Sequence, residues 1–145
     1  MNNQIFKPRT DFGPTPFVTD LGKATITNNT YRTALWTGPK MQITMMSIDP
    51  SDDIGLEVHP DNDQLLRIEH GTGIVEMGPS EHNITDKQRI HQGYTVFVPA
   101  GTWHNIINTG TDAMKISVVY SPSHHPHGTV HQTKAIAEAS ESHHY

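Results

Sequence analysis

Cysteine is absent from this chain of 145 residues, so disulfide bonds and thiolate metal sites are excluded. Basic residues are also few: ten Lys and Arg stand against fifteen Asp and Glu, and the formal net charge is −5. Proteins that bind nucleic acid or anionic membranes need a basic face, so we predict no nucleic-acid and no membrane partner. No apolar run approaches the roughly 18 residues of a membrane span, and the first ten residues lack the apolar centre of a signal peptide. We therefore expect a cytoplasmic protein.

The residues that are present indicate one globular domain. Hydrophobic residues make up 34% of the chain and charged residues 17%, a polar composition that is still typical of folded proteins. Histidine is the outlier, with eleven copies, four of them at positions 124, 125, 127 and 131. Histidine is the commonest metal ligand and the side chain that titrates near neutral pH, so some of these copies are candidates for a functional site.

Short apolar or alternating runs, separated by turn-forming residues, dominate the chain from Tyr31 onward. The runs are YRTALW, MQITMMSI, IGLEVH, QLLRIE, GIVEM, TVFVP, WHNIIN and AMKISVVY. Runs of about this length and spacing are typical of an antiparallel sandwich or barrel. Only residues 133–142, rich in Ala and Glu, predict a helix. We expect an N-terminal arm over residues 1–28 with an edge strand near Phe17, a barrel over 29–122 and a His-rich tail with a short helix over 123–145.

Three side chains that can bind a metal, those of Glu57, His59 and Gln64, lie close together in the sequence. In an extended segment Glu57 and His59 project from the same face, roughly 6.5 Å apart along the strand. After a turn, Gln64 begins the next run with Leu66 and Ile68 on its face. An amide that faces inward among apolar residues needs a partner. A metal ion or a backbone hydrogen bond would supply one.

A second stretch, residues 93–108, reads GYTVFVPAGTWHNIIN. Its Pro99–Gly101 piece predicts a tight turn between two apolar runs, since proline presets φ and glycine suits the exit. His104 would then enter a strand just after the corner. Trp103 is predicted to face the other side of that strand and to pack beneath another element.

Together the two stretches resemble the two motifs of the cupin superfamily. The second motif is matched at every defined position, namely by Gly93, Pro99, Gly101, His104 and Asn108. In the first motif His59 and Gly71 match, whereas Glu57 and Gln64 replace the usual first histidine and the usual glutamate. Ser51 stands where the opening glycine is expected. The resemblance covers roughly residues 30–121.

The resemblance implies an all-β fold, a double-stranded β-helix or jelly-roll barrel, here with a short C-terminal helix. It also implies one divalent metal ion inside the barrel, bound by the residues at the four motif positions, Glu57, His59, Gln64 and His104. Nitrogen and oxygen ligands without sulfur suit Zn, Mn, Fe, Co or Ni. The alternative is a cupin that has lost its metal. Because jelly-roll cupins commonly pair through sheet faces and N-terminal strands, the resemblance further implies a homodimer.

Three functions remain open at this point. The ligand inventory is similar to that of type I mannose-6-phosphate isomerases, cupin-type zinc enzymes that use glutamine, histidine, glutamate and histidine. This similarity predicts a metal-dependent isomerase acting on a small polar, sugar-like ligand. Two histidines and one carboxylate also occur in non-haem iron oxygenases. The third alternative is a non-catalytic module that binds a small ligand or a metal.

The remaining charged and histidine residues have less specific interpretations. Five basic residues could contact a phosphate group but are interpreted as solvated surface charges, namely Arg32, Lys40, Arg67, Arg89 and Lys115. Arg67 is three residues after the inward-facing Gln64, so strand alternation places it on the outer face of the barrel. The roles of His124, His125, His127 and His131 stay open between a polar loop over the barrel mouth, a lid that lends an acid or base, and a weak second metal site.

Overall fold

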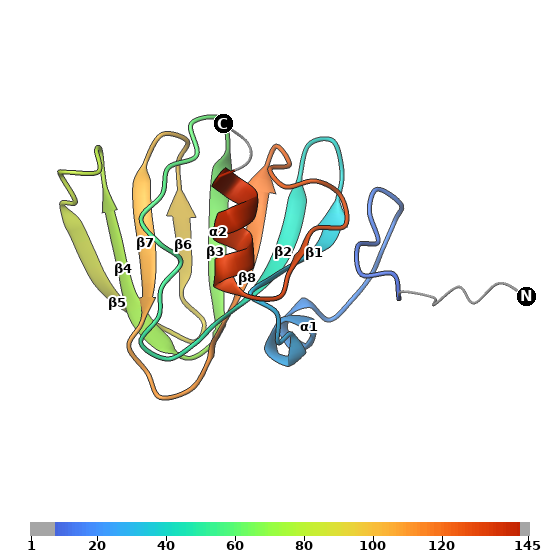
Figure 1. Ribbon diagram of the computed structural model, residues 1–145, viewed down its shortest axis with the longest axis horizontal. Coiled ribbons are helices and arrows are strands. Elements are labelled where there is room, and N and C mark those ends of the chain that lie inside the picture. The colour runs from blue at the N-terminus through green and yellow to red at the C-terminus, as the bar shows by residue number, and fades with distance from the viewer. Residues whose placement is uncertain (1–7, 143–145) are drawn as a thin grey trace, which may run out of the picture.

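The computed structural model describes residues 8–142, and two antiparallel β-sheets form most of it (Figure 1). The six-stranded sheet has the order β6-β3-β8-β2-β1-β9, and the three-stranded sheet has the order β5-β4-β7. The strands are β1 Arg32–Thr37, β2 Gln42–Ile48, β3 Asp63–His70, β4 Thr72–Gly78, β5 Asp86–His91, β6 Thr95–Val98, β7 Trp103–Asn108, β8 Met114–Ser121 and β9 Val130–His131. The helices are α1 Leu21–Thr27 and α2 Lys134–Ser142.

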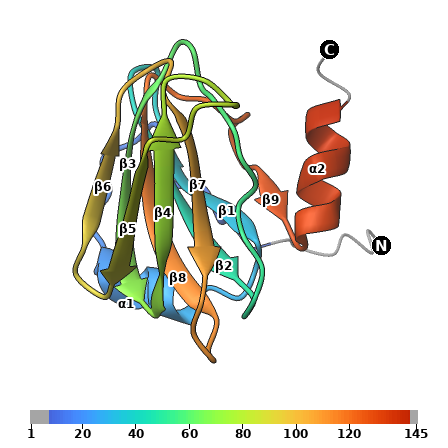
Figure 2. The same cartoon turned by 90° about the vertical axis from the view of Figure 1, so that its left-hand side faces the viewer.

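The hydrophobic core lies between the two sheets, which Figure 2 shows from the side of β4 and β5. Strand side chains alternate between faces, so every second residue of β3 and β8 points inward. Leu66, Ile68, Ile116 and Val118 are at most 1% exposed. The all-β barrel and the inward direction of Leu66 and Ile68 are therefore confirmed.

The run IGLEVH, expected as a strand, is an irregular segment that lies beside β7. It makes only isolated bridges, such as the pair in which the Glu57 N–H donates to the His104 carbonyl at 3.0 Å and the His104 N–H donates back at 2.9 Å. Gly55 has φ of 86°, a left-handed conformation that a regular strand cannot contain. The segment thus continues the three-stranded sheet past β7 without completing a ladder.

Three other elements differ from the sequence expectations. Helix α1 was not predicted, because its seven residues are too few to show helical periodicity; Asp20 caps it by accepting from the Lys23 N–H. No strand forms at Phe17, whose ring instead stacks on Phe12 at 4.5 Å. β5 was missed because Ile90 is its only buried residue, so its sequence carries no apolar pattern. The C-terminal helix is confirmed as α2.

Asp11 joins the segment before α1 to the barrel and to the tail. Its carboxylate is 2% exposed and accepts from the Thr37 N–H and hydroxyl and from the Gly128 N–H. Residues 1–7 of the predicted arm and 143–145 of the predicted tail lie outside the described residues, and the boundaries of arm, barrel and tail stay a prediction. Within residues 8–142, no helix is long and apolar enough to cross a membrane.

Candidate metal centre

Local backbone geometry places the four predicted ligands on three segments. The Pro99–Thr102 turn forms as predicted: the Thr102 N–H donates to the Pro99 carbonyl at 3.1 Å, and Gly101 takes φ of 83°. His104 follows it on β7, and the backbone bridge described above sets Glu57 opposite His104. Gln64 is the second residue of β3.

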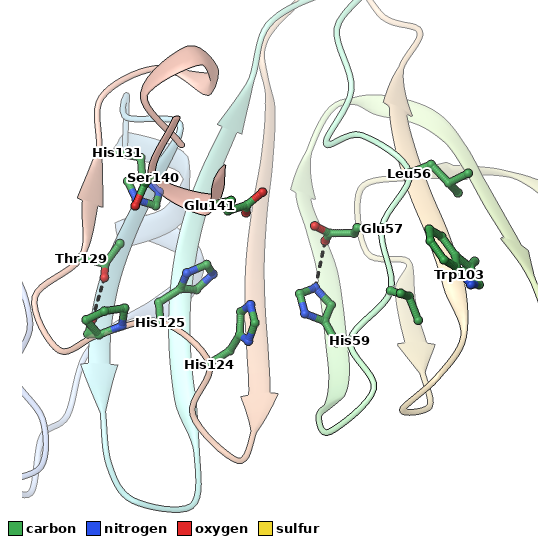
Figure 3. Close-up of a pocket in the computed structure, with 12 residues that line it drawn as sticks. Leu56, Glu57, His59, Trp103, His124, His125, Thr129, His131, Ser140 and Glu141 are labelled. Atoms are coloured by element: carbon green, nitrogen blue, oxygen red, sulfur yellow. Dashed lines mark hydrogen bonds and ion pairs between the residues drawn. The ribbon is translucent and has the colours of Figure 1, made fainter. Parts of the chain in front are cut away.

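Three of the four predicted ligands converge on one point. Glu57 Oε1 lies 3.1 Å from His59 Nε2, drawn in Figure 3, and 3.4 Å from His104 Nε2. One ligand atom of each residue lies within 4.8 Å of the others. Ligand atoms around a tetrahedral ion with bonds of about 2.1 Å are about 3.4 Å apart. The spacing therefore fits a single metal ion.

Hydrogen bonding fixes the form of His104 that a metal needs. Its Nδ1 lies 3.1 Å from the Thr102 carbonyl, an acceptor only, so Nδ1 must donate. In the neutral ring Nε2 then carries a lone pair. This atom is buried and has no hydrogen-bond partner among residues 8–142, although the Glu57 carboxylate faces it. A lone pair and a carboxylate oxygen repel each other at this distance, whereas a shared cation would bind both.

Gln64 faces the same interior as the other three. It is 4% exposed, and its Oε1 is a second buried atom without a hydrogen-bond partner in the described chain. Its cross-strand neighbour Tyr120 has its ring 5.9 Å from the His59 ring. Buried polar atoms are nearly always paired. His104 Nε2 and Gln64 Oε1 are both atom types that bind metals, so two unpaired atoms of this kind in one barrel interior fit a metal ion.

The charge state of Glu57 suits a cation. Burial alone would raise the pKa of its carboxyl, but the neighbouring His104 and His59 side chains hold that pKa well below its ordinary value. The carboxylate is therefore ionised at neutral pH. Glu57 is the one acidic member of the cluster, so a divalent ion would leave an excess of positive charge at the centre.

A cavity of about 850 Å³ opens over this centre. Figure 3 shows Glu57 and His59 on one side of it and His124, His125 and His131 on the other. Trp103, which we expected to pack beneath another element, lines the cavity instead. Glu141 comes from α2, and burial together with the charge of Glu57 raises the pKa of its carboxyl. The cavity is large enough for a small organic molecule.

Comparison with known proteins places this chain in a family. A family model described as Cupin domain matches residues 44–120. This chain belongs to the cupin family. It is 53% identical over 131 residues to the uncharacterized protein YrkC of Bacillus subtilis, covering 90% of this chain and 70% of that one.

Two further relatives support the assignment. The crystal structure of BH2720 from Bacillus halodurans is 50% identical and superposes with a TM-score of 0.89, covering 90% of this cupin and 98% of that chain. The uncharacterized protein L612 of Acanthamoeba polyphaga mimivirus is 41% identical over 115 residues, which is 79% of this chain and 70% of that one. The jelly-roll fold expected from the motifs is confirmed.

The four tail histidines of this cupin divide into two groups. His124, His125 and His131 line the cavity, and the His124 ring lies 4.4 Å from the His59 ring. Burial, with the charge of Arg32, lowers the pKa of His125 to about 2, so this ring is neutral at physiological pH. His127 instead contacts the Gly13 carbonyl at 2.8 Å. It therefore helps Asp11 to attach the N-terminal segment.

Two cations interpreted as surface charges are buried, so that prediction was wrong for them. Arg32 is 3% exposed inside the barrel, and Lys115 is 8% exposed with its Nζ bonded to the Asn28 carbonyl. Arg67 behaves as predicted, with 51% of its side chain exposed. The alternation of β1 contained no usable signal, because its first four residues, Arg32 to Leu35, are all buried.

Proposed function

We propose that this cupin binds one divalent metal ion through Glu57, His59, Gln64 and His104 and catalyses a metal-dependent isomerisation of a small polar, sugar-like substrate. The observation that carries the metal is the pair of buried, unpartnered ligand atoms, His104 Nε2 and Gln64 Oε1, beside the Glu57 carboxylate. The observation that supports a substrate is the cavity that Glu57 and His59 line.

A divalent ion at this position would polarise a carbonyl or hydroxyl oxygen of the substrate. The protein must then move a proton between neighbouring substrate atoms. Glu141 is suited to this role, because it lines the cavity and its raised pKa lies closer to neutrality, where proton transfer in both directions is efficient. His125 is a poor base at a pKa of about 2, and we assign it to hydrogen bonding and orienting the substrate.

His59 must rearrange its proton when a metal ion binds. Its Nε2 lies 3.1 Å from Glu57 Oε1 and donates to it without metal. A metal ligand atom cannot keep that proton, so the neutral ring would carry its proton on Nδ1 in the metal-bound form. Long-range 1H–15N correlation spectra recorded with and without zinc would measure this change of tautomer.

The second candidate function is oxygenation. The cluster of Glu57, His59 and His104 holds two histidines and one carboxylate, the ligand set of non-haem iron oxygenases. The two candidates separate on metal identity: bound zinc favours isomerisation, and bound iron favours oxygenation. A protein that binds metal and ligand but turns over no substrate would support the third alternative, a binding module.

The first test is metal content by elemental mass spectrometry, on protein purified without a tag or chelator. We expect about one equivalent of metal per chain, lost in His104→Ala and in Gln64→Ala. His82→Ala is the matched control, because the His82 side chain is 89% exposed. Metal that is absent from the wild type, or retained in both site variants, would contradict the four-ligand assignment.

We also infer a homodimer in the cytoplasm. Cross-strand pairing aligns five apolar side chains in a row across the outer face of the six-stranded sheet, namely Phe97, Leu65, Val119, Ile43 and Trp36. Phe97 is 69% exposed and the other four are half-buried, and a continuous apolar row of this kind favours a partner surface. Phe97→Asp should shift the mass measured by light scattering from dimer to monomer, whereas Gln88→Asp on β5 should not. A wild-type monomer would refute the inference.

A further inference from the structure

Arg32 is a buried charge that lacks a partner of opposite charge. It is the first residue of β1 and points into the barrel, 3% exposed. No carboxylate in residues 8–142 lies within ion-pair distance of it, and its Nε has no hydrogen-bond partner there. The Tyr31 ring, 5.3 Å away, offers a cation–π contact, and the neutral Tyr120 hydroxyl offers a hydrogen bond. Burying a charge is costly unless it is paired, so this position favours an anion that the protein itself does not supply.

Arg32 contacts His131, a residue of the cavity wall, and so influences the hydrogen bonding at that wall. Arg32 Nη1 lies 3.1 Å from His131 Nδ1. A guanidinium only donates, so Nδ1 accepts and the proton of the neutral imidazole must sit on Nε2. Burial and the charge of Arg32 lower the pKa of His131, which keeps the ring neutral. His131 lines the cavity, so it presents a fixed N–H donor there with a positive charge behind it.

The charges around the cavity leave this donor unbalanced. Glu57 is a half-buried carboxylate of the interior, and the proposed metal ion would use it. Glu141 also lines the cavity and its charge interacts with that of Arg32, but these two described side chains form no ion pair, and the His125 and His131 rings of the same wall are neutral. A ligand with anionic oxygens would accept from the His131 donor and compensate the guanidinium, and a neutral sugar would leave the guanidinium uncompensated.

We propose that the ligand of this cavity carries a carboxylate, which accepts a hydrogen bond from His131 Nε2 and is electrostatically stabilised by Arg32 behind it. Arg32 is a positioning residue, since it acts through His131, and His131 is the binding residue. The proposal rests on the proposed function and narrows it: the substrate is a small hydroxy or oxo acid rather than an uncharged sugar. Its carboxylate would lie across the cavity from the metal ligands.

Calorimetric titration with lactate and with 1,2-propanediol tests the charge requirement, because the two probes are similar in size and differ in the carboxylate. We expect the wild type to bind lactate at least about tenfold more tightly than propanediol, the effect of one charge-assisted hydrogen bond. Arg32→Gln and His131→Gln should each abolish that preference. Arg67→Gln is the matched control, an arginine whose side chain points out of the barrel. Inorganic phosphate serves as a third probe, and binding of phosphate in preference to lactate would overturn the choice of a carboxylate.

The titrations are made on metal-loaded and on metal-free protein, which separates this proposal from the proposed metal site. A lactate preference that depends on Arg32 in both forms supports the anion site, even if metal content refutes the metal site. A preference found only with metal, and unchanged in Arg32→Gln, would mean that the metal alone binds the carboxylate and would overturn the proposal. Equal binding of lactate and propanediol by the wild type would also overturn it.

A spectroscopic measurement on the wild type avoids dependence on variants that fail to fold. Long-range 1H–15N correlation spectra distinguish a histidine protonated on Nε2 from one protonated on Nδ1. We expect His131, assigned by its loss in His131→Gln, to carry its proton on Nε2 and to shift when lactate is added. A proton on Nδ1, or a resonance indifferent to lactate, would contradict the Arg32–His131 donor.

Discussion

Replacing Gln64 with leucine should stabilise the metal-free protein while removing its response to metal. Gln64 lies between Val98 and Tyr120 in the six-stranded sheet and is 4% exposed. Its Oε1 lacks a hydrogen-bond partner among the described residues. A buried polar atom without a partner costs about 1–3 kcal/mol relative to a paired one, and an apolar replacement of similar size removes that cost. The Gln64 amide therefore lowers the stability of the metal-free protein, and a bound metal ion would remove this loss.

The assay is urea unfolding with a chelator and with the metal found in the native protein. In chelator we expect Gln64→Leu to raise the free energy of unfolding by about 1–2 kcal/mol. With metal in excess, the wild type should gain stability according to the metal concentration and its affinity, whereas the variant should gain little. We therefore expect Gln64→Leu to be more stable than the wild type in chelator and less stable than the wild type in excess metal.

Gln88→Leu is the matched control, because Gln88 is an exposed residue of β5 outside the barrel interior. It should change stability little in either condition. A larger loss in the free energy of unfolding for metal-free Gln64→Leu than for metal-free Gln88→Leu would contradict this prediction. Full stabilisation of Gln64→Leu by metal would also contradict it, since Gln64 would then be no ligand.

Two further perturbations test the cavity wall and the N-terminal segment. The pKa of His125 is about 2 in the folded protein against an ordinary value of 6.5, so the unfolded chain binds the extra proton between these values and stability falls as pH drops below about 6.5. Unfolding titrations should show this slope, up to about 1.4 kcal/mol per pH unit from this group, reduced in His125→Asn but not in His82→Gln. Asp11→Ala should cost about 2–4 kcal/mol, because it leaves the backbone and hydroxyl donors of Thr37 unpaired. The exposed Asp61→Ala is its control in urea unfolding, and equal losses in the two variants would refute the anchoring role of Asp11.

The fold was predictable because its strands are either buried on one face or closed by strong turns. Alternation in QLLRIE placed Gln64, Leu66 and Ile68 on one inward face, and the structure confirms that all three are buried. The Pro99–Gly101 turn fixed the entry of His104. β5 could not be predicted in this way, because a strand with one buried residue at the edge of a sheet needs no apolar pattern. Helix α1 is stabilised by its cap and its packing, and its sequence shows no helical periodicity from which it could be predicted.

The candidate site was predictable only in part, for a related reason. Glu57 and His59 stood out by their spacing, although the segment that carries them is not a regular strand, and the resemblance to the cupin motifs added His104. The histidines of the opposite wall were visible as a cluster without a role, since their placement depends on how the tail folds back over the barrel. His124 and His125 approach the cavity, whereas His127 turns toward the N-terminal segment.

Arg32 shows why average burial statistics mislead at such a site. Arginine is rarely buried unless it is paired, and that general rule led to its interpretation as a surface charge. The rule holds for stable folds whose charges are satisfied internally. A binding cavity is the exception, because its partners arrive with the ligand. The unpaired groups of this cavity are therefore explained by a bound ligand. On one wall, the buried lone pairs of His104 and Gln64 favour a cation. On the other wall, the buried guanidinium of Arg32 favours an anion.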